Sequence, residues 1–150
     1  MLELVTTAII TASSVLLFGY WFRYTCVLIL SAKTTRDYAA AVATANQLGF
    51  LEVQSQLCQS VPQLDQMKAA LDRDYAVLTY LLKNAANATS GEESLEKRML
   101  EINYRVMGAW YSVSRKFSPA AAARAIEEMS QVVAHFANAM GERAAAGAAA

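Results

Sequence analysis

Catalytic and metal sites on helices most often use histidine, cysteine and paired carboxylates. In this sequence these residues do not occur at the spacings that such sites need. His135 is the single histidine and Val132 stands three positions before it, so the Glu-x-x-His pairs of di-iron bundles are absent. Cys26 and Cys58 give neither a zinc spacing nor a disulfide framework. No P-loop or GxGxxG glycine pattern occurs. The sequence therefore predicts no catalytic residue, no metal ion and no cofactor, and His135 is interpreted as a polar or partly buried helix residue rather than a haem ligand.

The composition argues against a nucleic-acid partner, and it is short of charged residues at the N-terminus. Thirteen basic residues balance thirteen acidic ones, which removes the general electrostatic attraction to nucleic acid. Charged residues make up 17% of the chain, below the ~25% typical of soluble domains. The deficit lies at the N-terminus, because no charge occurs between Glu3 and Arg23. The alanine-rich composition favours a bacterial host, and the length of 150 residues suits one domain.

An uncharged, mostly apolar run extends from Leu4 to Phe22, close to the ~20 residues that a helix needs to cross a membrane. A cleaved signal peptide would have a basic region before this run and a small-residue cleavage site after it. The chain instead begins Met-Leu-Glu, and the run ends in Tyr20-Trp21-Phe22-Arg23. We therefore predict an uncleaved transmembrane anchor, with a helix buried in a soluble core as the alternative.

Arg23 lies among aromatic residues, in the segment 20–24 that contains two tyrosines and a tryptophan. Tyrosine and tryptophan gather at membrane interfaces, and a long arginine side chain can reach the headgroups. Two interpretations stay open, because residues 27–30 are apolar as well. In the first interpretation, the hydrocarbon ends near Phe22 and protein covers residues 27–30. In the second, the span reaches Leu30, and Arg23 faces an acidic partner or a lipid phosphate within the membrane. We favour the first.

Basic residues near the ends of the span predict its orientation. Arg23, Lys33 and Arg36 follow the span, and no basic residue precedes it. The positive-inside rule then places the N-terminus outside and the rest of the chain in the cytoplasm. The expected location is the inner cell membrane, with a single pass.

One face of the span is made of small residues. At 100° per residue, Ala8, Ala12 and Gly19 fall on the same side, where small side chains let two helices approach closely in lipid. These three residues are the predicted helix–helix contact, with a second copy or with a larger membrane complex. The alternative is that small residues are ordinary filler in an anchor.

From Lys33 onward the apolar pattern is helical throughout, with no persistent strand-like alternation. The first predicted segment, 35–57, continues from the membrane helix, although Gly49 weakens or bends it. Three further helices are predicted: the first ends near 86, the second ends near 117, and the third begins at Ser118-Pro119. The predicted inward residues are Leu64, Met67, Leu71, Leu78 and Leu81 on the first and Ile126, Met129, Val133, Phe136 and Met140 on the third. Capping boxes at Ser60–Gln63 and Ser90–Glu93 introduce the first two of these.

The helix that ends near Phe117 carries the strongest amphipathic pattern. Its predicted inward stripe comprises Leu95, Met99, Ile102, Val106, Trp110, Val113 and Phe117. A neighbouring stripe of Tyr104, Tyr111 and Arg115 is a candidate protein contact, because Tyr and Arg are favoured in interface hot spots. Its alternative interpretation is a wide core face with solvated charges.

The predicted fold class is all-α: a single N-terminal transmembrane helix continuing into a cytoplasmic antiparallel bundle of about four helices. The expected domains are an anchor and interfacial segment at 1–32, the bundle at 33–143 and an alanine-rich tail at 144–150.

The predicted function is non-enzymatic: an interaction or scaffold protein, or an accessory subunit of a membrane complex. Its expected partners are membrane lipid and either further copies of the chain or a larger membrane complex, with neither nucleic acid nor an identified small-molecule substrate. A membrane-anchored signalling bundle is the alternative, and an enzyme with an unrecognised site is a remote one.

Overall fold

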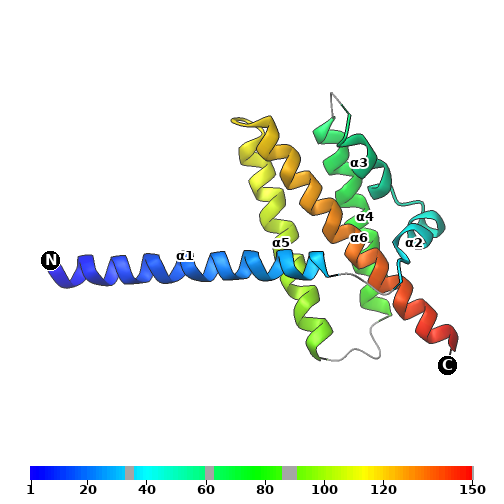
Figure 1. Cartoon of the computed structure of the whole chain (residues 1–150), viewed down its shortest axis with the longest axis horizontal. Helices are drawn as coiled ribbons and strands as arrows, with labels where there is room; N and C mark the ends of the chain where they lie inside the picture. Colours follow the sequence, from blue (N-terminus) through cyan, green and yellow to red (C-terminus); the bar gives the residue numbers. More distant parts are fainter. Residues whose placement is uncertain (33–35, 60–62, 86–90, 150) are drawn as a thin grey trace. The chain divides into compact units, whose positions relative to one another are not determined.

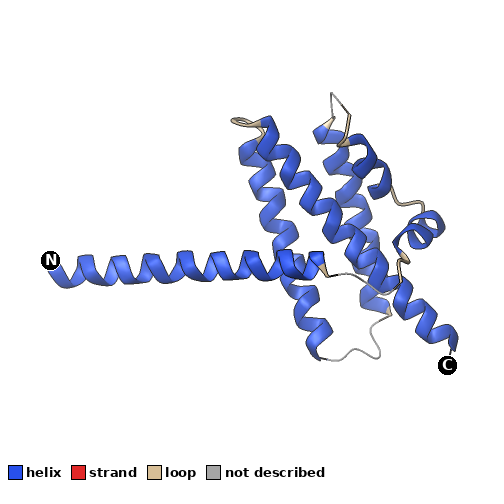
Figure 2. Ribbon diagram, in the orientation of Figure 1, coloured by secondary structure: helices blue, strands red, loops and turns tan. Residues whose placement is uncertain are grey.

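The computed structural model describes residues 1–32, 36–59, 63–85 and 91–149, and within them every regular element is a helix (Figures 1 and 2). The predicted all-α class is confirmed. The chain divides into two compact units, Met1–Ala32 and Lys33–Ala150. The first unit is one long apolar helix, and the second packs five helices together.

The helix of the first unit, α1, spans Leu2–Ser31 and is long and apolar enough to cross a membrane. The structure differs from the prediction at its end, because the helix does not continue into the next segment. Ala32 has φ −63° and ψ 123°, an extended conformation that stops the helical hydrogen-bond ladder. No proline or glycine marks this stop in the sequence.

The segment predicted as one helix over 35–57 forms two short ones, α2 (Ala39–Asn46) and α3 (Phe50–Gln56). Gln47 separates them with a left-handed φ of 54°, which ends α2, and Gly49 is the N-cap residue that precedes α3. The predicted weakness at Gly49 thus corresponds to a complete break between two helices.

The longest helix, α6 (Pro119–Ala149), is the centre of the second unit. It packs against each of the other four helices, and Figure 1 shows it running between α4 (Leu64–Asn84) and α5 (Gly91–Ser114). The predicted start of α6 is confirmed: the Ser118 hydroxyl accepts a hydrogen bond from the Ala121 backbone N–H at 3.3 Å. The other two predicted caps include Ser60 and Ser90, which lie outside the described residues.

The core of the second unit lies between α4 and α6, as the apolar periodicity of those helices predicts. Most of their predicted inward residues are buried, among them Met67, Leu71 and Leu78 on α4 and Ile126, Met129, Val133 and Phe136 on α6. Three alanines are also buried on α6, Ala122, Ala125 and Ala137, and their small side chains bring the neighbouring helices close to its backbone.

The predicted inward face of α5 is wrong. The name α5 apolar stripe is used for six exposed residues, five on α5 and one in the turn that follows it: Leu95, Ile102, Val106, Trp110, Val113 and Phe117. The opposite face is buried instead, with Leu100 and Met107 beside the hydrogen-bonding side chains of Asn103, Tyr104 and Tyr111. The physical reason is that these polar groups find partners on α4 and α6, so the large tyrosine rings can enter the core.

Candidate functional site

The predicted membrane contact residues Ala8, Ala12 and Gly19 lie exposed on α1. A Cβ atom added at Gly19 meets no other heavy atom within 4 Å. The small-residue face is therefore open to an approaching helix, and its use as a contact stays a prediction.

The aromatic residues around Arg23 form a contiguous group on α1. The Trp21 ring meets Tyr20 and Tyr24 edge-on, with centroid distances of 6.2 and 5.9 Å, and the two tyrosine rings stack at 6.3 Å. Arg23 lies in the same turn of the helix. This arrangement gathers amphipathic rings and one cation into a band, the composition that a membrane interface favours.

The predicted contact residues Tyr104, Tyr111 and Arg115 bond to α4 within the second unit. The Tyr104 hydroxyl donates to Asp72 at 2.9 Å, while the Tyr111 hydroxyl and the Arg115 guanidinium donate to Asp65 at 2.7 and 2.6 Å. Tyr104 and Tyr111 are only 5% and 2% exposed. Their role here is to join α5 to α4.

Burial keeps these phenols protonated. Desolvation raises the pKa of Tyr104, and its hydrogen bond to Asp72 raises that pKa further. Tyr104 also stacks on Tyr75 with ring centroids 4.0 Å apart. The phenol is thus a fixed donor to a carboxylate, which is the wrong state for a general base.

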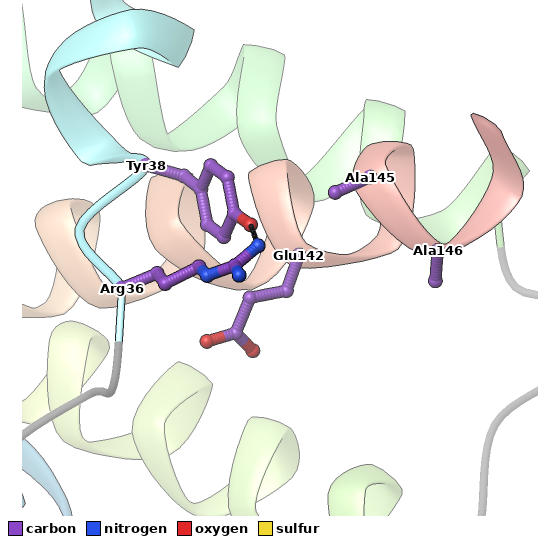
Figure 3. A pocket seen from close by; sticks show the side chains of 5 residues that line it. All are labelled: Arg36, Tyr38, Glu142, Ala145 and Ala146. Carbon is purple, nitrogen blue, oxygen red and sulfur yellow. Dashed lines mark hydrogen bonds between the residues drawn. The ribbon is translucent and has the colours of Figure 1, made fainter. Parts of the chain in front are cut away.

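A hollow of about 340 Å³ opens at one end of α6 and is lined by Arg36, Tyr38, Glu142, Ala145 and Ala146 (Figure 3). The Arg36 guanidinium donates to the Tyr38 hydroxyl at 3.4 Å, and this contact raises the pKa of Arg36. In Figure 3 the Arg36 and Tyr38 side chains point toward each other above Glu142. We interpret the cation, the carboxylate and the phenol at this open hollow as side chains that pack on the surface.

Asn138 links α2 to α6 beside this hollow. Its side-chain oxygen accepts the Tyr38 backbone N–H at 2.7 Å, and its amide nitrogen donates to Glu142 at 3.1 Å. Asn138 is buried, so both polar ends of its amide are satisfied where an unpaired end would be costly. The contact fixes where α2 begins.

Asp74 is a buried carboxylate, 2% exposed, that holds the start of α3. It accepts the Gly49 backbone N–H at 2.8 Å and is also hydrogen-bonded by the Phe50 N–H. Burial raises the pKa of Asp74, and the two amide hydrogen bonds oppose that rise. The carboxylate satisfies amides that would otherwise be unpaired at a helix N-terminus. Its role is that of a cap supplied by another helix.

Groups of three or more His, Cys, Asp or Glu side chains able to hold a metal ion do not occur in the part of the chain that the structure describes. His135 is partly buried on α6, where burial lowers its pKa and the charges of Glu96 and Glu142 act in the opposite direction.

This environment makes His135 an acid-sensitive position. Between about pH 7.5 and pH 5, the unfolded chain takes up a proton at this residue before the folded chain does, so folding loses stability as the pH falls through 6.5. We expect His135→Gln to reduce the loss of stability over this range, measured by urea unfolding in mild detergent. An equal acid-dependent loss in both proteins contradicts the assignment.

Comparison with protein-family models, with curated proteins and with solved structures finds no match for this chain.

Proposed function

We propose that this chain is a single-pass membrane protein whose first unit anchors the helical second unit at the cytoplasmic face of the cell membrane. The observation that carries the proposal is α1, whose most apolar 18-residue window has a mean hydropathy of 1.7 and is 0% buried. A core helix of a soluble protein would be covered by other helices. In this proposal, membrane lipid surrounds α1 in place of other helices.

The polar side chains of α1 support this environment. The Thr7, Ser14 and Thr25 hydroxyls donate to the carbonyl oxygens four residues earlier, at 2.8, 2.8 and 2.9 Å. Hydroxyls bonded within their own helix need no partner from outside it. Such a helix meets the requirement that polar groups in hydrocarbon be satisfied internally.

The anchored unit acts, in this proposal, as an interaction or scaffold subunit rather than an enzyme. The motivation on the second unit is that its buried polar groups are engaged in helix capping and helix–helix contacts, as Asp74 and Asn138 are. On the first unit, the small-residue face at Ala8, Ala12 and Gly19 is available for association with a second copy or a larger membrane complex.

The orientation is part of the proposal. Arg23, Lys33 and Arg36 follow the hydrophobic segment and place the second unit in the cytoplasm by the positive-inside rule. Lys33 lies outside the described residues.

The test is to place charges at the centre of α1 in the full chain. Each arginine at the centre of a span costs roughly 2.5–3.5 kcal/mol of insertion free energy. We expect Ile10→Arg with Leu17→Arg to release the chain from the carbonate-resistant membrane fraction. The matched control, Ile10→Leu with Leu17→Ile, keeps the apolar character and should remain in the membrane.

Two outcomes contradict the anchor. One is an intact mass of the membrane-expressed protein that lacks the first unit, which would identify a cleaved signal sequence. The other is equal membrane retention of the arginine variant and its control.

A further inference from the structure

Among the residues of the second unit that the structure describes, most of the large apolar side chains left exposed belong to the α5 apolar stripe. Its exposed fractions are 61% for Leu95, 51% for Ile102, 44% for Val106, 51% for Trp110, 51% for Val113 and 82% for Phe117. The five residues on α5 recur at steps of three, four and seven, so they lie on one face of the helix, and Phe117 follows in the turn after it. At 1.5 Å per residue the helical part of the stripe, from Leu95 to Val113, is about 27 Å long.

Rotation of α5 within the second unit cannot hide this face. The opposite face is already buried, and its Tyr104 and Tyr111 hydroxyls are bonded to α4. A contiguous exposed apolar surface of this length marks an interaction site. Its partner must come from outside the second unit.

Three exposed cations, Arg98, Arg105 and Lys116, follow one edge of the stripe. At 100° per residue Arg98 and Arg105 fall within about 20° of each other around α5, on one side of the apolar residues, and Lys116 follows in the turn after the helix. The neighbouring carboxylate, Glu101, is paired with Lys97 at 3.8 Å. The edge therefore presents positive charge beside an aromatic and aliphatic surface.

We propose that the α5 apolar stripe docks on the surface of an anionic lipid bilayer. Trp110, Phe117 and the aliphatic residues enter the boundary between headgroups and acyl chains, while the edge cations bind lipid phosphates. This inference rests on the proposed membrane anchor, which keeps the second unit beside the bilayer. It gives α5 a ligand of stated chemistry, a negatively charged membrane surface.

Charge distribution favours lipid over a second copy of the chain. An antiparallel two-fold pairing of two α5 stripes places the cation edge of one copy beside the same edge of the other, and like charges there repel. Anionic headgroups neutralise that edge instead. Attachment through α1 also raises the local concentration of bilayer around α5, so a weak surface contact is sufficient.

The test uses the two tryptophans of the chain as separate reporters. The full chain is reconstituted in vesicles of phosphatidylcholine with brominated acyl chains and added phosphatidylserine. In the Trp21→Phe protein, the remaining Trp110 reports contact of α5 with lipid, and we expect its emission to be quenched. In the Trp110→Phe protein, Trp21 reports the anchor alone.

Matched variants in the Trp21→Phe background separate surface binding from folding. Val106→Glu with Val113→Glu should abolish quenching of Trp110, because both side chains are exposed and the core is untouched. Arg98→Gln with Lys116→Gln should reduce the quenching about twofold through lost attraction to phosphatidylserine. Lys83→Gln with Arg124→Gln removes two exposed cations from other helices and should leave the quenching unchanged. Circular dichroism checks that all variants stay helical.

Each alternative outcome overturns the proposal in a recognisable way. If acrylamide in the water quenches Trp110 fully and the bromines do not, α5 remains in solvent. If Trp110 is shielded from acrylamide without bromine quenching, and crosslinking rises with protein concentration, a second copy covers the stripe. Unquenched Trp21 contradicts the anchor, independently of the result at Trp110.

Discussion

Gly141→Ala is expected to lower the free energy of unfolding by about 3 kcal/mol, the upper end of the usual cost of overpacking. A Cβ added at Gly141 overlaps the Cβ of Tyr38 and lies 2.8 Å from its Cγ, and Val42 Cγ2 is 3.2 Å away. These atoms belong to the start and the body of α2, which Asn138 holds against α6. The added methyl group therefore has to displace a helix.

The direction of this effect runs against helix propensity. Alanine is favoured over glycine within helices by about 1 kcal/mol, so the substitution would stabilise the protein if the site were open. Gly108→Ala provides that control, because its Cβ would meet only the Met129 Cε at 3.8 Å, an ordinary contact. We expect Gly108→Ala to be neutral or mildly stabilising.

Urea unfolding in mild detergent, followed by circular dichroism, measures both variants. The detergent keeps α1 in an apolar environment, so the transition reports the second unit. A Gly141→Ala protein as stable as wild type would show that α2 does not pack on α6 at this point.

Asp74→Ala is expected to cost about 3 kcal/mol, since each buried amide left unpaired costs about 1–3 kcal/mol. The substitution removes the acceptor for the Gly49 and Phe50 N–H groups at the start of α3. Part of the cost is offset, because alanine also removes a carboxylate whose charge is disfavoured by burial.

Asp74→Asn separates the hydrogen bonds from the charge. It keeps one side-chain oxygen as an acceptor, so we expect a smaller loss, about 1 kcal/mol. The exposed carboxylate Asp65 is the control, with a side chain that is 70% exposed although it bonds Arg115. Asp65→Asn should cost at most about 1 kcal/mol. An Asp74→Ala protein no less stable than Asp65→Asn contradicts the capping role of Asp74.

Three features could be predicted from the sequence: the helical class, the core stripes of α4 and α6, and the start of α6 at Ser118. Each depends on local spacing or on one local hydrogen bond. The end of α1 at Ser31 could not be predicted. Its extended neighbour Ala32 carries no proline or glycine signal. The separation of α2 from α3 was only partly visible, through Gly49.

The face of α5 was predicted wrongly for a more general reason. Periodicity identifies which residues share a face, but α5 has large side chains on two faces. The less apolar face is the buried one, because its tyrosine hydroxyls bond Asp65 and Asp72 on another helix, and no local pattern shows these partners. The same error concealed the candidate lipid surface, because the residues assigned to the core were the exposed ones.

The central position of α6 has a consequence for how the protein is made. Four helices of the second unit, α2 to α5, precede it in the sequence, and each packs on it. A nascent chain therefore emerges with α2, α3, α4 and α5 lacking the surface that covers their apolar faces until the ribosome has delivered α6. Domains that cannot close until late in synthesis expose apolar surface to aggregation and to chaperones meanwhile. The hydrophobic α1 leaves the ribosome before these five helices. Under the proposed anchoring, delivery of α1 to the membrane would hold the growing chain apart from other chains while α6 is completed.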